Sequence, residues 1–357
     1  MLHSQGQPAL TSATQTVSGA QPWVASARKD LWLVLPPFVV VALALTLHPQ
    51  LAALEARYAW WTWLVLIVCI DVAHVYASIF RSYLLPQAWA RQRRLFVAIP
   101  LMCLLTSVLL YQAGSAVFWS VLAYVAVFHF IRQQWGLLRL YARFEAKTRL
   151  GTAIDAAAIY SATLYPMLYW MVSADRQFVW FVDNEFVRLF SPAILPALTA
   201  LYLAIMAVYL VWVAWQWMTG RIFNLPKNLI VLGTYVSWYV GIVYFNHPLI
   251  FTLLNVVSHG VPYMALVYFA DISGKAREFT LLGKLCSWPG LAVYVAVLLS
   301  LAVLEETLWE LAVWGEHLSA AFLLEAEWLW LAVPLLALPQ LTHYVLDGFI
   351  WRRPKKP

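Results

Sequence analysis

Long apolar runs separated by short polar connections dominate the chain from residue 31 to residue 351. An α-helix needs about 20 mostly apolar residues to cross the roughly 30 Å hydrocarbon core of a bilayer. Ten runs meet this length, approximately 31–50, 59–80, 95–113, 116–138, 152–173, 192–219, 228–246, 248–270, 287–305 and 328–351. Runs this long exclude barrel strands, and backbone groups in lipid must be satisfied within the segment, so the pattern predicts about ten transmembrane helices.

Composition supports the same class. Hydrophobic residues make up 63% of the chain and charged residues only 11%, whereas about 25% of residues are charged in soluble domains. We therefore expect an all-α, polytopic integral membrane helix bundle, with a single transmembrane domain over 29–352. A polar tail over 1–28 is expected to be disordered, and a short basic tail follows at 353–357. The three cysteines form no C-x-x-C pair, which gives no sign of a disulfide framework or a zinc site.

The basic residues predict the orientation of the bundle. Most of the 23 Lys and Arg residues fall on the connections of one side, together with both termini, and the positive-inside rule makes that side cytoplasmic. Acids gather on the other side, among them Glu305, Glu306 and Glu310. The net charge of +6 is explained by a basic face against anionic lipid, so no nucleic-acid partner is expected. The predicted location is the inner membrane of a bacterium.

Four histidines lie within these apolar runs, and each has a polar residue one helical turn away. The pairs are His74 with Asp71, His129 with Gln133, His259 with Asn255, and His343 with Asp347. Polar side chains near the middle of a bilayer are costly and usually face a protein interior. The four histidines lie on the second, fourth, eighth and tenth runs, so their helices run in one direction and one shared site in the cytoplasmic half is possible. His259 lies furthest from the next cytoplasmic basic residue and fits least well.

The neighbouring polar groups suggest roles. Asp71 and Asp347 share a helix face with their histidines, where a carboxylate can orient the imidazole or transfer protons. Arg132 is placed with them as a catalytic group, although its side chain near a helix end can also snorkel. Gln133 and Asn255 are weaker ligands and are expected to support the cofactor from outside the ligand shell. Gly136 on the face of His129 is expected to allow close approach of a neighbouring helix.

Four patches of the chain resemble the Brp/Blh family of integral-membrane β-carotene 15,15'-dioxygenases, which hold iron with histidines. The patches are the early His with a nearby Asp, the Phe128-His129-Phe130 run, the Asn255 to His259 pair, and the C-terminal stretch that begins at His343. The resemblance implies that His74, His129 and His259 are iron ligands. This chain has Asn255 where the family has a second histidine, and its early Asp precedes its His instead of following it. The resemblance thus leaves His343 to complete a set of four.

The residues themselves favour metal-dependent oxygen chemistry. Imidazole suits zinc, copper and iron, and a His-rich site with one or two carboxylates and open positions is typical of non-haem iron. The expected cofactor is Fe(II), with copper, zinc or haem as alternatives. The expected function is an oxygenase that uses O₂ to oxidise or cleave a lipophilic substrate, such as an isoprenoid, a carotenoid or an acyl lipid. Membrane lipid is the other expected partner.

Two other functions fit the same residues. A membrane cytochrome can use paired histidines as axial haem ligands, and a transporter can use intramembrane Asp and His as a proton or metal pathway. A single membrane histidine can also serve only as a hydrogen bond between helices. The chain has no H-x-x-H-H run, P-loop, G-x-S-x-G or H-E-x-x-H motif. It therefore offers no basis for a di-iron desaturase, an NTPase or a hydrolase.

Overall fold

The protein is described by a computed structural model that covers residues 21–173, 176, 179–272, 288–318 and 320–351. All regular structure within these residues is helical. The first half contains α1 (Ala27–Val34), α2 (Pro36–Thr62), η1 (Trp63–Val72), α3 (Ala73–Arg81), α4 (Pro86–Ala113), α5 (Ser115–Tyr141) and α6 (Arg149–Val172). The second half contains η2 (Pro192–Ile194), α7 (Leu195–Met218), α8 (Leu225–Trp238), η3 (Tyr239–Tyr244), α9 (Pro248–Val267), η4 (Tyr268–Ile272), α10 (Trp288–Trp309), η6 (Glu310–Trp314), η7 (Ala320–Phe322), α11 (Ala326–Leu336) and α12 (Leu338–Ile350). The elements η1, η3, η4 and η6 are π-helices, and η2 and η7 are 3₁₀-helices.

Eight helical stretches in the described part of the chain are long and apolar enough to cross a membrane, which indicates a multi-pass membrane protein. Two of the ten predicted segments, 152–173 and 228–246, are also helical, in α6 and in α8 with η3, but they are not among the eight. Both carry buried polar side chains, Asp155 on α6 and Lys227 on α8. A helix that contributes polar groups to the interior of a bundle needs less apolar surface than a helix that faces lipid.

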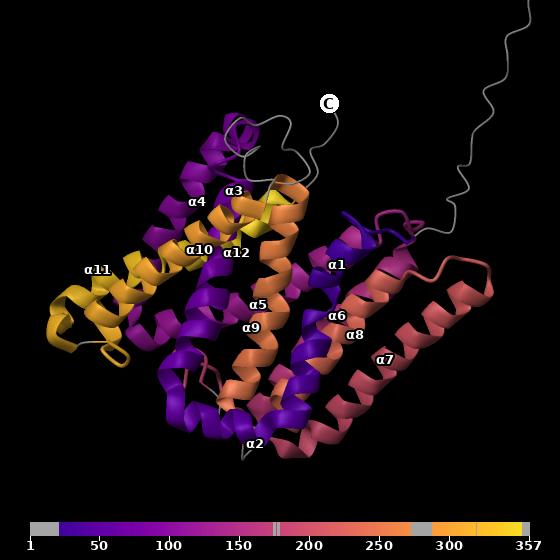
Figure 1. Ribbon diagram of the computed structural model, residues 1–357. Coiled ribbons are helices and arrows are strands. Elements are labelled where there is room, and N and C mark those ends of the chain that lie inside the picture. Colours follow the sequence, from indigo (N-terminus) through magenta and orange to yellow (C-terminus); the bar gives the residue numbers. More distant parts are fainter. Residues whose placement is uncertain (1–20, 174–175, 177–178, 273–287, 319, 352–357) are drawn as a thin grey trace, which may run out of the picture.

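Helix α9 lies at the centre of the bundle and α7 at its edge (Figure 1). Of the most apolar stretch of each span, 67% is buried in the α9 span and 11% in the α7 span. Contacts with α1, α2, η1, α3 and α8 surround α9. Proline at the first turn begins several helices, including α2, α4, α8 and α9, because the missing N–H is not needed there. The described chain begins and ends at the same end of the bundle.

Residues 21–28, which were predicted to belong to a disordered tail, pack on the bundle. Trp23 and Val24 contact a buried hydrophobic cluster, and Arg143 donates hydrogen bonds to the carbonyls of Pro22 and Trp23 at 2.7 and 2.6 Å. The buried carboxylate of Asp30 accepts hydrogen bonds from the backbone of Val24 at 2.6 Å and from the Tyr141 hydroxyl at 3.1 Å. The rest of that tail, 1–20, and the basic tail, 353–357, lie outside the described residues.

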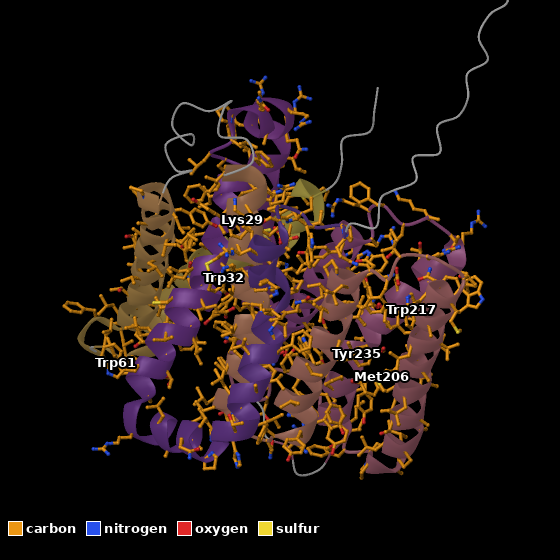
Figure 2. All side chains as sticks on the ribbon, turned by 45° about the vertical axis from the view of Figure 1, so that its right-hand side comes forward. Lys29, Trp32, Trp61, Met206, Trp217 and Tyr235 are labelled. Atoms are coloured by element: carbon orange, nitrogen blue, oxygen red, sulfur yellow. The ribbon has the colours of Figure 1, made fainter. Side chains whose placement is uncertain are left out.

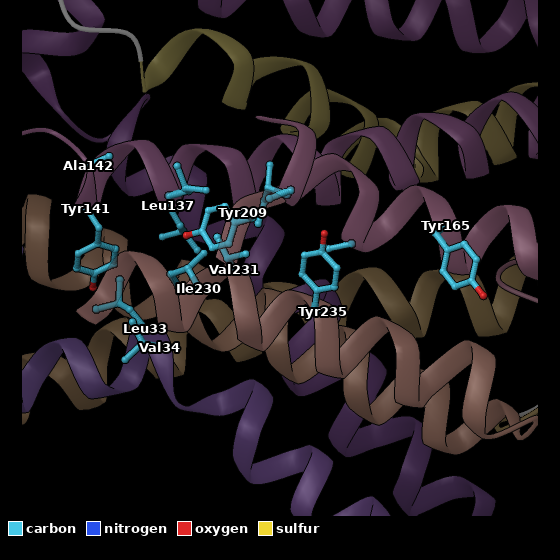
Figure 3. Close-up of a cluster of buried hydrophobic side chains, with 14 of the residues drawn as sticks. Leu33, Val34, Leu137, Tyr141, Ala142, Tyr165, Tyr209, Ile230, Val231 and Tyr235 are labelled. Atoms are coloured by element: carbon cyan, nitrogen blue, oxygen red, sulfur yellow. The ribbon is translucent and has the colours of Figure 1, made fainter. Parts of the chain in front are cut away.

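The largest buried hydrophobic cluster joins α1 to α5, α6, α7 and α8 (Figure 3). Leu33 and Val34 of α1 belong to the same cluster as Tyr141 of α5 and Val231 of α8. Figure 2 shows the contrasting outer surface, where Trp61 and Trp217 lie on opposite flanks of the bundle. Their side chains are 56% and 66% exposed, as expected for aromatic residues that meet lipid or its interface.

A buried ion pair fixes α8 against α6. The Lys227 side chain is 2% exposed, and its Nζ lies 2.9 Å from a Glu145 carboxylate oxygen and 3.5 Å from an Asp155 carboxylate oxygen. Arg139 on α5 reaches the other oxygen of Asp155 at 3.8 Å. Burial of any one of these charges is tolerable only because the others are present.

Replacement of Lys227 by Met is expected to destabilise the protein strongly. Removal of one partner from a buried ion pair typically costs about 3–5 kcal/mol, because the remaining charge is buried without compensation. Thermal unfolding in detergent should show a lower midpoint for Lys227→Met and partial recovery in Lys227→Met with Asp155→Leu. Lys147→Met, at an exposed position nearby, is the matched control. Equal midpoints for Lys227→Met and this control would contradict the assignment.

Candidate metal centre

Four histidines from four helices meet in the interior of the bundle. His74 comes from α3, His129 from α5, His259 from α9 and His343 from α12, and each is at most 2% exposed. The Nε2 atoms of His74 and His259 are 3.1 Å apart. Ring centroids are 4.6 Å apart for His129 and His343, and 5.0 Å apart both for His129 and His259 and for His74 and His343. The structure thus brings together all four histidines singled out in the sequence.

The spacing of the ring nitrogens fits ligands of a single ion. Ligand nitrogens of His74, His129 and His343 all lie within 4.8 Å of one another. Two imidazole nitrogens, each about 2.1 Å from one metal ion, are separated by roughly 3.0–3.4 Å at angles between 90° and tetrahedral. The separation between His74 and His259 falls in this range, although His259 does not belong to the set of three whose nitrogens all lie within 4.8 Å of one another.

Several ring nitrogens in the cluster have no hydrogen-bond partner. The Nε2 atom of His129, the Nδ1 atom of His259 and both nitrogens of His343 are buried and unpaired. Buried polar atoms are nearly always paired with protein or ordered water, so exceptions call for an explanation such as an ion. Buried, unpaired imidazole nitrogens are the donor type that iron, copper and zinc accept. The residues present therefore fit a metal ion of this group.

His74 is oriented by the main chain of Asp71 and not by the Asp71 carboxylate, although orientation of the imidazole is one of the two roles expected of that carboxylate. The Nδ1 atom of His74 donates a hydrogen bond to the main-chain carbonyl of Asp71, while the Asp71 carboxylate lies 3.7 Å from the same nitrogen. This bond leaves Nε2 to face the other histidines, where it lies within hydrogen-bond distance of Nε2 of His259. Asp71 lies in the last turn of η1, and His74 follows at the start of α3. Short π-helical segments occur frequently at functional sites.

His259 is positioned by a proline kink and two glutamines. Pro262 lies inside α9 and has no N–H, so it cannot bond to the carbonyl of Ser258 four residues earlier. The Gln134 amide donates to this Ser258 carbonyl at 3.4 Å, and the Gln133 amide donates to the carbonyl of His259 at 2.8 Å. Gln133 therefore supports the site from outside it. Gln134 was not predicted as a site residue, although a proline four residues after Ser258 signals a carbonyl in need of a donor.

Gly260 allows α9 to approach the π-helix η1. A Cβ atom at Gly260 would lie 2.9 Å from Ile70 Cγ2, 3.1 Å from the Ile70 carbonyl oxygen and 3.5 Å from His74 Cβ. The predicted close approach at Gly136 is wrong, because a Cβ atom there would meet no other atom within 4 Å. The close helix contact that brings two histidines together thus depends on the glycine after His259.

Three other predicted site residues have different contacts from those expected. Asp347 is 3.8 Å from Nδ1 of His343 and instead accepts a hydrogen bond from the Tyr263 hydroxyl at 2.5 Å. Arg132 is exposed, and its guanidinium donates to the Tyr160 hydroxyl at 3.1 Å. Its expected place among the catalytic groups is therefore corrected. Asn255 donates to the Phe251 carbonyl at 2.9 Å, and its buried Oδ1 atom has no partner.

Aromatic side chains enclose the imidazoles. The Phe130 ring stacks on His259 with centroids 3.8 Å apart and an angle of 14° between the planes. The Tyr344 ring lies 4.7 Å from that of His129, and the Tyr263 ring 5.1 Å from that of His343. Their contribution was not predicted, because apolar sequence neighbours of a histidine look like any other core residue. The enclosure keeps water away from the ring nitrogens.

His259 lies level with the other three histidines, which resolves the doubt about its depth. From His259 the helix continues through η4 to Ile272, about as far as α5 continues from His129 to Tyr141. Distance to the end of the helix therefore locates His259 better than distance to the next basic residue. Lys275, the basic residue from which the depth of His259 was predicted, lies outside the described residues.

A cavity of about 260 Å³ borders the histidine cluster. Asp71, Phe130 and Asn255 belong both to its wall and to the surroundings of the imidazoles. On the stretches that carry His74, His259 and His343, cavity residues precede the histidine: Asp71, Asn255 and Gln340. On α5, Trp119 precedes His129 and Phe130 follows it directly. This order agrees with four helices that run in the same direction, with the cavity on their N-terminal side.

No family model, curated protein or solved structure matches the chain. The geometry of the four imidazoles and of the adjacent cavity is therefore the basis for an assignment of function. The resemblance to membrane-bound dioxygenases that the sequence motifs suggest stays a prediction.

Substitution of Gly260 by Ala is expected to disturb the site, although Ala favours a helix by about 1 kcal/mol over Gly. The added methyl would overlap the carbonyl and side chain of Ile70 and push α9 away from η1. Gly136→Ala is the matched control, since it adds the same methyl on α5 without a contact. The purified Gly260→Ala protein should have a lower thermal midpoint and hold less metal than the purified Gly136→Ala protein. A Gly260→Ala protein as stable and as rich in metal as Gly136→Ala would refute the contact.

Proposed function

We propose that this protein is an integral-membrane, histidine-ligated metalloenzyme, a non-haem iron oxygenase that acts on a lipophilic substrate. The observation that carries the proposal is the convergence of four buried imidazoles, three of which have ring nitrogens without a hydrogen-bond partner. A hydrogen bond across a helix interface, the ordinary role of a histidine in a membrane helix, accounts for the pair of His74 and His259, but it does not account for the unpaired nitrogens of His129 and His343. Intramembrane ionisable residues that gather in this way mark functional sites by default.

His74, His129, His259 and His343 would hold the ion, and Fe(II) is the metal that suits this set best. Bound there, ferrous iron would supply the activation of O₂ for oxidation or cleavage of an isoprenoid, carotenoid or acyl lipid. Copper or zinc would also accept these ligands. The sequence resemblance to the Brp/Blh family supports iron and oxygen chemistry, with His343 in place of the histidine that Asn255 replaces.

The chain's own groups have distinct tasks in this proposal. Asp71 lies between the cavity and the Nδ1 atom of His74, so its carboxylate can hold or pass a proton at the boundary between substrate and ligand. Asp347 accepts the Tyr263 hydrogen bond and fixes a wall of the site. Gln133 holds the backbone of His259 in place. Phe130 and the neighbouring tyrosines exclude water from the imidazoles.

Convergence on a point favours a single ion over a haem. Two axial imidazoles must face each other across a porphyrin, whereas the Nε2 atoms of His74 and His259 are 3.1 Å apart.

We place the protein in a bacterial inner membrane with ten membrane helices and both termini in the cytoplasm. The basic connections support this orientation. The cavity would then open toward the outer leaflet, on the N-terminal side of the histidines.

Metal content is expected to depend on the four histidines. Detergent-purified protein loaded with Fe(II) under anaerobic conditions should hold about one iron per chain, without a haem Soret band. His129→Ala and His343→Ala should each weaken iron binding at least tenfold. Loss of a group that only supports a ligand typically costs about 10–100-fold in metal affinity, so loss of a ligand should cost no less. The exposed His48 supplies the control, His48→Ala. Stoichiometric metal in both site variants would contradict the proposal that these histidines bind one ion, and a Soret band would favour a haem protein.

Oxygenase activity is expected to require the same residues. Iron-loaded protein in nanodiscs should consume O₂ when supplied with a membrane lipid extract that contains isoprenoids and carotenoids, and mass spectrometry should reveal products that carry ¹⁸O from ¹⁸O₂. Asp71→Asn should retain iron but react more slowly, because a neutral amide cannot accept a proton. Iron binding without any oxygen uptake over a broad set of lipids would contradict an oxygenase.

A further inference from the structure

The cavity beside the histidine cluster has aromatic walls. Five tryptophans line it, Trp63, Trp119, Trp180, Trp309 and Trp314, together with three phenylalanines. Trp119, Trp309 and Trp314 form a cluster, with ring centroids between 5.5 and 5.9 Å apart. Tryptophan has the strongest attraction for cations among aromatic rings, and sets of such rings recognise quaternary ammonium groups.

The charged side chains that line the same cavity are acidic. Asp71, Glu306, Glu310 and Glu316 belong to its wall, and none of the described residues that line it is Lys or Arg. Glu310 is occupied, since it accepts hydrogen bonds from the backbone of Glu316 at 3.0 Å and of His317 at 2.7 Å, and contacts the His317 ring. Glu306 is only 8% exposed and accepts a hydrogen bond from the Trp63 indole. Buried carboxylates are rarely found without a cationic partner.

An unpaired acceptor points to a ligand in the same cavity. Asn255 is 2% exposed. Its Nδ2 atom donates a hydrogen bond to the Phe251 carbonyl, and its Oδ1 atom has no partner. Asn255 lines the cavity one turn before His259. A buried amide oxygen of this kind requires a hydrogen-bond donor, and the protein groups around it do not supply one.

We propose that this cavity binds an organic cation, an amine or quaternary ammonium group on an apolar body, with its charge near Glu306 and its apolar surface against Trp119, Trp309 and Trp314. Asn255 Oδ1 would accept a hydrogen bond from a donor on the same molecule. Phe130 in the cavity wall stacks on His259 at 3.8 Å, so the bound molecule would lie one side chain away from the imidazoles. As a statement about the substrate, this inference narrows the proposed acyl lipid to one that carries such a headgroup and rests on the proposed oxygenase function; as a statement about binding, it does not.

Two other occupants make different demands. A neutral lipid chain would use the aromatic walls but leave the carboxylates without a partner. A divalent metal ion would use the carboxylates but gain little from five tryptophans. An organic cation satisfies both kinds of wall at once, which is why we favour it.

The test compares choline with its neutral carbon isostere 3,3-dimethylbutan-1-ol, which has the same shape and hydroxyl group. Binding is measured by calorimetry and by tryptophan fluorescence, on chelator-treated protein in a non-ionic detergent. Choline should bind at least about tenfold more tightly, equivalent to about 1.4 kcal/mol. Glu306→Gln and Trp314→Leu should each remove most of this preference, whereas Trp314→Tyr should keep part of it.

Glu327→Gln, at an exposed acid outside the cavity, is the matched control and should bind choline like the original chain. Thermal midpoints of all variants verify that they are folded. Equal affinity for the two probes would overturn the proposal in favour of an apolar pocket, and displacement of choline by Mg²⁺ at equal concentration would overturn it in favour of a metal ion. Choline binding in His129→Ala separates this inference from the iron centre, since the cation site should survive loss of the metal.

Discussion

The histidine cluster depends on how the bundle satisfies the backbone of its central helix at Pro262. In an apolar interior, a carbonyl that has lost its helical partner needs another donor. Gln133 and Gln134 of α5 provide donors to two successive carbonyls of α9, and these bonds fix the rotation and height of α9 against α5. Gly260 then lets the same turn of α9 touch η1. His259 is thereby placed between His74 and His129 by the backbone.

The convergence of the histidines could be predicted from sequence because its cause is periodic. Polar residues three or four positions apart in an apolar run must share an inward face, and four such faces on co-directional helices have few places to meet. The partners of these residues could not be predicted in the same way. Arg132 and Gln133 are adjacent in sequence but have different partners, since one bonds to the half-buried Tyr160 and the other to the backbone of His259. Periodicity indicates the face of a helix, but the helix packed against it decides the contact.

The acids at the end of α10 and the start of η6 show a second limit of sequence reasoning. Glu305, Glu306 and Glu310 look like residues of an outer connection, because charged residues usually end a membrane segment. Instead the helix continues into η6, and all three side chains are buried. Tyr76 donates a hydrogen bond to Glu305 at 2.5 Å, and the loop after η6 folds back to bond to Glu310. Composition alone cannot distinguish an acid that ends a helix from one that lines an internal cavity.

The position of Asp71 connects the two proposed sites by electrostatics. A metal ion among the histidines and an organic cation in the cavity would carry like charges in a region of low dielectric, where repulsion over a few ångströms is large. Asp71 lines the cavity and also lies 3.7 Å from His74, so one carboxylate would be attracted to both positive charges and reduce their mutual repulsion. By thermodynamic linkage, each occupant must change the affinity of the other by the same factor. Neutralisation of Asp71 would therefore turn two compatible sites into competing ones, which a purely structural carboxylate would not do.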